Sequence, residues 1–139
     1  MRQSSRMQSL IQKMAKTRGV DLGTVGTHWR AKSSPFMDLV VETIGRNCVS
    51  VAHYYTQNGD MCQDPEIVFW MCPLDGKWYP IEWTTPPFMI LGRVGGGYDK
   101  VLWLDAEGTA WEKAKVRSQA ELAKFANQWS TNLRRQGFA

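Results

Sequence analysis

The order of hydrophobic and polar residues predicts one amphipathic helix near each end of the chain. An apolar stripe with spacings of three and four runs through residues 4–18, and its members are Met7, Leu10, Ile11 and Met14. A second stripe lies near the C-terminus, and its members are Leu122, Phe125, Ala126, Trp129 and Leu133. Ser118 and Glu121 have the spacing of a capping box, so the second helix is expected to begin at Ser118. Gly19 and Gly137 stand where such helices commonly end.

Between the helices the pattern changes to short segments rich in β-branched and aromatic residues, which predict strands. These segments span residues 36–44, 48–56, 66–72, 78–84, 100–105 and 109–111. Asn58-Gly59 and Asp75-Gly76 are typical of hairpin turns. Residues 92–100 hold three consecutive glycines without a phosphate-binding motif, and we expect them to form a flexible loop. Antiparallel hairpins flanked by an N-terminal and a C-terminal helix give an α+β fold.

The composition is that of a folded protein with few candidates for metal or redox chemistry. Of the 139 residues, 43% are hydrophobic, which is enough for one core. The apolar runs are too short to span a membrane, and residues 1–19 lack the apolar centre of a signal peptide, so we expect a cytoplasmic protein with no membrane partner. Cys48, Cys62 and Cys72 form no CxxC pair, which favours free thiols. The sequence predicts no metal site and no cofactor.

Basic residues are concentrated at the N-terminal end. Residues 1–32 carry seven bases against one acid, and the rest of the chain carries ten bases and twelve acids. The seven bases are Arg2, Arg6, Lys13, Lys16, Arg18, Arg30 and Lys32. We therefore divide the chain into a basic N-terminal helix and linker, residues 1–34, and a single α+β domain, residues 35–139. The basic arm could contact nucleic-acid phosphates, with Trp29 meeting a base, or it could be a solvated helix with Trp29 packed on the domain.

One stretch, HYYTQNGDMCQDPE at residues 53–66, holds a histidine, two tyrosines and three carboxylates. Alternation along the strand at 48–56 places His53 on the same face as Val49 and Val51. A hydrolase centred on His53 would need a carboxylate within reach across the hairpin. The candidates are Asp60, Asp64 and Glu66. The spacing matches no calcium-binding loop, and the other interpretation is a structural hairpin with turn-forming aspartates and packed tyrosines.

The same stretch carries a resemblance. The segments DLVVETIG, VSVAHYYTQNGDMCQDPEIVFW and WYPIEW, with a closing helix ending LRRQGF, resemble a family of small uncharacterised proteins carried by plasmids, phages and other bacterial mobile elements. Those proteins share the phrase HYYxQNGDxxxDPE, and the likeness covers about residues 37–84 and 119–138. The resemblance implies a mobile-element setting, in which small proteins often bind and block host defence machinery, as anti-CRISPR proteins do.

The leading hypothesis is a non-enzymatic binding protein of a mobile genetic element that inhibits a bacterial defence complex. It would act through aromatic anchors and carboxylates that contact a basic channel of the partner protein. The expected contact residues are His53, Tyr54, Tyr55, Asp60, Asp64, Glu66, Trp78, Tyr79 and Trp83. Two alternatives stay open: a nucleic-acid-binding accessory protein that uses the basic arm, and the hydrolase centred on His53.

Overall fold

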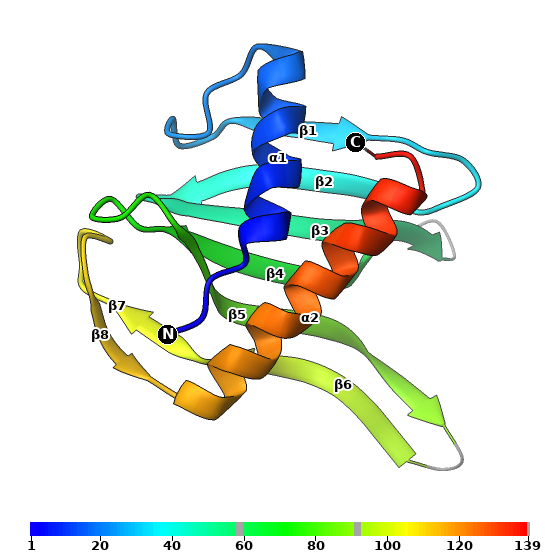
Figure 1. Ribbon diagram of the computed structural model, residues 1–139. Helices are drawn as coiled ribbons and strands as arrows, with labels where there is room; N and C mark the ends of the chain where they lie inside the picture. The colour runs from blue at the N-terminus through cyan, green and yellow to red at the C-terminus, as the bar shows by residue number, and fades with distance from the viewer. Residues whose placement is uncertain (58–59, 91–92, 139) are drawn as a thin grey trace.

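An antiparallel sheet with two helices on one face forms the frame of the molecule (Figure 1). The computed structural model describes residues 1–57, 60–90 and 93–138, and within these it gives the backbone alone for residues 55–57, 60–64, 86–90 and 93–96. The elements are α1 (Ser5–Arg18), β1 (His28–Ala31), β2 (Asp38–Gly45), β3 (Cys48–Gln57), β4 (Asp60–Met71), β5 (Trp78–Ile90), β6 (Arg93–Lys100), β7 (Leu102–Leu104), β8 (Trp111–Ala114) and α2 (Val116–Arg135). The predicted α+β class is confirmed.

The main sheet is a meander in which strands β1 to β6 follow one another in chain order, each antiparallel to the next. The predicted flexible loop at residues 92–100 is wrong, because β6 runs through the glycines and pairs with β5. The hydrogen-bonding ladder of β5 supplies the order that glycine-rich residues lack by themselves. The register of this pair shifts between Thr85 and Phe88, where β5 contains two prolines. Such a bulge accommodates residues that cannot donate to the ladder. The predicted turn at Asn58-Gly59 lies outside the described residues.

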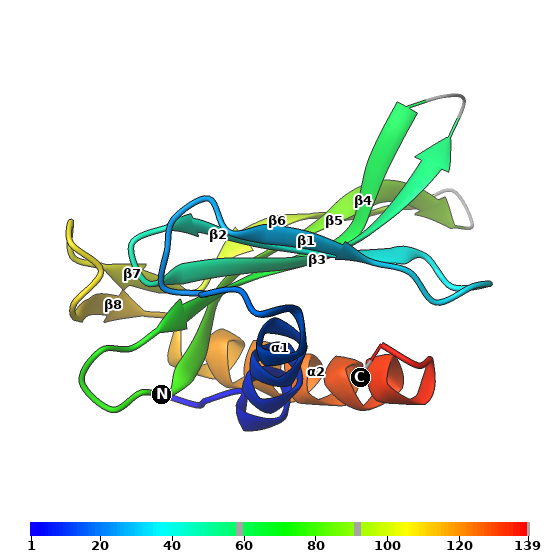
Figure 2. The same cartoon turned by 90° about the horizontal axis from the view of Figure 1, so that it is seen from above.

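Both helices pack on the same face of the sheet, called the inner face (Figure 2). Buried side chains from α1, α2 and the strands form one cluster there. From the strands it includes Leu39, Val41, Val49, Val51, Ile67, Phe69 and Trp78, all at most 2% exposed. From α1 it includes Met7, Leu10, Ile11 and Met14, likewise at most 2% exposed. The predicted boundary between residues 34 and 35 therefore does not separate two cores: α1 and β1 complete the same one.

A smaller core lies on the opposite, outer face of the sheet. Its buried members are Val68, Trp70, Cys72, Ile81 and Leu102. The hairpin of β7 and β8 covers them and is held by its turn, where the carbonyl oxygen of Gly108 accepts hydrogen bonds from Trp70 Nε1 at 2.8 Å and from Asn47 Nδ2 at 3.1 Å. The rest of the outer face is left uncovered by this hairpin.

The observed end of α1 agrees with the sequence-based prediction, and the observed start of α2 differs from it. Helix α1 ends at Gly19 in the left-handed conformation, as predicted. Helix α2 begins at Val116 and has no side-chain cap, so the predicted start at Ser118 is wrong. Strand β8 leads into α2 through Lys115, whose N–H donates to the carbonyl of Val101 at 2.9 Å. The residue between β6 and β7 thus provides an acceptor close to where a cap would act. Neither helix of the described chain is long and apolar enough to cross a membrane.

We predict that α1 contributes to the stability of the whole fold. Leu10→Ala should lower the free energy of unfolding by about 2–5 kcal/mol, because Leu10 is fully buried. Gln12→Ala, at an exposed position of the same helix, should change it by less than about 0.5 kcal/mol. Urea denaturation measures both. Equal stabilities for the two variants would show that α1 is not part of the core.

We also predict that the turn between β7 and β8 tolerates no side chain at Gly108. A Cβ there would lie 2.6 Å from the carbonyl oxygen of Arg46, and φ is +69°. Gly76 has a similar φ of +72° with nothing within 4 Å. Gly76→Ala should therefore cost about 1–2 kcal/mol from its backbone conformation alone, and Gly108→Ala should cost clearly more. Equal losses of unfolding free energy in urea denaturation would contradict the close approach of Gly108 to the carbonyl of Arg46.

Candidate functional site

The solvent-facing side of the two helices is strongly basic. Helix α1 has four bases and no acid, and α2 has four bases and one acid, Glu121. All eight bases are exposed, because the apolar stripe of each helix faces the sheet and leaves its polar positions outside. Together with Arg2, they define the basic helical face: Arg2, Arg6, Lys13, Lys16, Arg18, Arg117, Lys124, Arg134 and Arg135.

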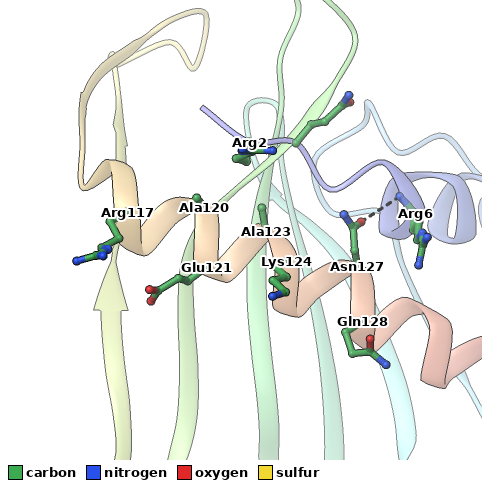
Figure 3. A pocket seen from close by; sticks show the side chains of 10 residues that line it. Arg2, Arg6, Arg117, Ala120, Glu121, Ala123, Lys124, Asn127 and Gln128 are labelled. Atoms are coloured by element: carbon green, nitrogen blue, oxygen red, sulfur yellow. Dashed lines mark hydrogen bonds between the residues drawn. The ribbon is translucent and has the colours of Figure 1, made fainter.

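Two open hollows lie between α1 and α2 on this face. The first has a volume of about 640 Å³ and is lined by Arg2, Arg6, Arg117 and Lys124, with Glu121, Asn127 and Gln128 among the other lining residues (Figure 3). The second has a volume of about 480 Å³ and is lined by Ser5, Arg6, Ser9, Ser130, Thr131, Arg134 and Arg135. Because Arg6 borders both, they form one groove along the helix pair. The backbone N–H of Arg6 donates to Asn127 Oδ1 at 3.1 Å and fixes the two helices side by side.

The groove offers hydrogen-bond donors suited to an anion. Guanidinium groups can donate two parallel hydrogen bonds to phosphate or carboxylate oxygens. Hydroxyl and amide groups from both helices stand between the bases. The described residues that line the second hollow include no acid. The groove can therefore hold several negative charges spaced along a line.

Six of the seven bases predicted to bind nucleic acid are exposed at or beside the helices. Lys13, Arg18 and Lys32 line a smaller pocket of about 180 Å³ beside Phe138. The seventh, Arg30, belongs to the other side of the sheet, because it alternates with the buried Trp29 and Ala31. Its Nε donates to Asp38 Oδ2 at 2.7 Å. Trp29 is packed in the core with the Arg18 guanidinium 5.7 Å from its ring centre, as one of the two interpretations expected.

His53 lies inside the protein. It is 6% exposed, and its ring centroid is 5.5 Å from that of Trp129 and 5.8 Å from that of Phe138. Glu66 lies on the outer face, where Ser50 Oγ donates to its carboxylate. The sheet therefore separates His53 from Glu66. The side chains of Tyr55, Asp60 and Asp64 lie outside the described residues.

The other predicted contact residues are also divided between the two faces. Trp78 is 2% exposed and packs on Phe69 in the main core, whereas Trp83 is half-buried at the edge of that core. Tyr54 is half-buried on the outer face, where burial and then the charge of Glu66 raise its pKa. On the same face, burial and a hydrogen bond from the Tyr79 hydroxyl to Asp75 at 2.6 Å raise the pKa of Tyr79 to about 12. These residues do not form one continuous surface.

The Cys48 thiol offers little nucleophilic character. Cys48 and Cys72 are free, and burial, followed by the nearby charge of Glu82, raises the pKa of the Cys48 thiol to about 11. A thiol with that pKa is almost entirely protonated at neutral pH. Within the described residues, no three His, Cys, Asp or Glu side chains lie together so as to hold a metal ion.

Sequence reasoning missed the half of the basic helical face that α2 contributes. Its bases are Arg117, Lys124, Arg134 and Arg135. The signal was available, because the polar side of the predicted C-terminal helix holds four bases and one acid. What the sequence does not contain is the packing of α1 beside α2, which makes the two polar sides one surface.

Comparison with known protein families gives a match over most of the chain. No curated protein and no solved structure matches the chain. The family described as Domain of unknown function (DUF6908) matches residues 5–139. The matched region begins with α1, includes every strand and ends beyond α2, so it also spans the boundary predicted between residues 34 and 35. Because the match covers nearly the whole chain, this protein belongs to the DUF6908 family.

Proposed function

We propose that this protein binds nucleic acid through the basic helical face and the groove between α1 and α2. The observation that carries the proposal is the gathering of eight exposed bases and a single acid on two adjacent helices. Nucleic acid is a polyanion whose charges follow one another along a line, as the basic side chains do along this groove. Phosphate contacts of this kind supply most of the affinity of sequence-independent binding.

The charge of the remaining chain supports this orientation. Outside the two helices the chain has nine bases and twelve acids. Among the residues of strands β1 to β6 whose side chains the structure describes, the outer face has four acids, Asp38, Glu42, Glu66 and Glu82, against the two bases Arg30 and Lys100. A molecule that is basic on one side and acidic on the other presents its basic side to a polyanion. We therefore expect the helices, not the outer face of the sheet, to meet the phosphates.

Binding of a basic protein is the second candidate function, and the outer face favours it. Tyrosines stand among carboxylates there: Tyr54 lies near Glu66 and Glu42, and the hydroxyl of the 59% exposed Tyr98 donates to Glu82. Such a surface complements a basic partner. The inhibition of a defence complex predicted above would use this face, and it stays a prediction. The hydrolase centred on His53 has less support, because His53 is buried and Glu66 lies across the sheet.

We predict that removal of three charges from the groove weakens nucleic-acid binding and its salt dependence. In the variant Arg6→Gln/Lys124→Gln/Arg134→Gln, the slope of log affinity against log salt should become shallower by about 2, since each phosphate contact contributes about 0.7–0.9. Fluorescence anisotropy with a labelled oligonucleotide over a series of salt concentrations measures this slope.

The matched control removes the same charge elsewhere. Arg46, Lys77 and Lys113 are exposed and line neither hollow, so Arg46→Gln/Lys77→Gln/Lys113→Gln should keep most of the affinity and the slope. Equal losses in the two triple variants would mean that net charge, and not the groove, determines binding. Wild-type affinity that does not change with salt would rule out the proposal.

A further inference from the structure

A separate pocket lies on the other side of α2, between this helix and the inner face of strands β4, β5 and β6. Its volume is about 380 Å³. Figure 1 shows α2 crossing the sheet at an angle, so that β6 is left beside it. In the sheet, Ile67, Trp83 and Asp99 stand in one row across the three strands. From α2, the pocket is lined by Ser118, Glu121, Leu122 and Phe125.

Two aromatic side chains border the pocket from opposite elements. Trp83 comes from β5 and is half-buried, and Phe125 comes from α2 and is 50% exposed. Phe125 is supported by Trp129, with 6.4 Å between the ring centroids. Ile67 and Leu122 add apolar surface. A planar ring that enters here could stack on an aromatic side chain and displace water from apolar surface.

Polar groups around the pocket suit the edge of a nucleobase. Asp99 and Glu121 provide acceptors, and Thr85 and Ser118 provide hydroxyl groups. The carboxylate of Asp99 is held by Lys115 Nζ at 2.7 Å. Carboxylates accept hydrogen bonds from the exocyclic amino group of cytosine. An amino-bearing base is therefore the planar ligand that these groups fit.

The basic helical face lies next to the pocket. Arg117 and Lys124 line the groove on one side of α2, and they directly precede Ser118 and Phe125, which line the pocket on the other side. A nucleic-acid strand that runs along α2 could thus place its phosphates on these basic side chains and insert a nucleobase into the pocket. A duplex could not do so without unpairing and unstacking that base.

We propose that this pocket receives an unstacked, amino-bearing base of a single-stranded nucleic acid, an inference that rests on the proposed function and narrows its ligand class. Aromatic stacking and a neighbouring basic track are the two features that single-strand binding uses. Accordingly, the protein prefers a single strand to a duplex.

The test uses the full chain and three labelled or competing polyanions. These are a short oligodeoxycytidylate, a duplex of the same length and inorganic polyphosphate, which has no bases. Phe125→Ala should weaken binding of the oligodeoxycytidylate about tenfold and leave the affinities for duplex and polyphosphate unchanged. Trp111→Ala is the control, because Trp111 is 49% exposed, much like Phe125, but lies on β8 outside the pocket.

The outcomes separate this inference from the proposed function. If the triple groove variant loses affinity for all three polyanions while Phe125→Ala loses none, the pocket inference is wrong and the proposed function stands. If the groove variant keeps its affinity for polyphosphate and for the oligonucleotide, the proposed function itself fails. The pocket inference is also wrong if Phe125→Ala and Trp111→Ala lose equal affinity for the oligodeoxycytidylate. It is likewise wrong if Phe125→Ala loses equal affinity for polyphosphate and for the oligodeoxycytidylate.

Discussion

The structure depends on covering the apolar inner face of its sheet. Burial of apolar surface contributes about 25 cal/mol per Å², and the inner face is lined by strand residues that are almost fully buried. Both helices bury their apolar stripes against it in a single cluster. Because the stripes must face inward, the polar residues of each helix must face outward. The basic helical face is therefore a consequence of core packing, since two helices with basic polar sides had to lie next to each other.

Local sequence patterns predicted most of the helices and strands. The features that these patterns missed depend on non-local contacts. The helix expected over residues 4–18 spans Ser5–Arg18, since its apolar stripe and its terminal glycine are both local signals. Strands β1 and β6 were missed because one is only four residues long and the other contains three glycines. Each is held by the ladder of one neighbour, and a ladder is not visible in the strand's own sequence. The start of α2 was missed because its first hydrogen bond is also non-local: the carbonyl of Val101 accepts from the N–H of Lys115.

The prediction of the candidate site was limited in the same way, because it could not include contacts between distant segments. Alternation correctly placed His53 with Val49 and Val51 on the buried face of β3. However, a list of contact residues chosen by chemical type combined Tyr54 and Glu66 of the outer face with Trp78 of the core. The basic residues were found on one helix and overlooked on the other, because no pattern in one segment indicates which distant helix will pack beside it. Charge becomes informative about function only after the fold has placed it.

The proposed function requires that the helices, and not the outer face of the sheet, bind the polyanion. The most direct test is a titration of isotope-labelled protein with a short single-stranded oligonucleotide, followed by amide chemical shifts. Binding through the helices predicts that shift changes gather at the exposed positions of α1 and α2 around Arg6, Lys124 and Arg134, while the amides near Tyr54 and Glu42 on the outer face stay unchanged. Changes concentrated on the outer face, or none during a titration to millimolar oligonucleotide, would contradict it.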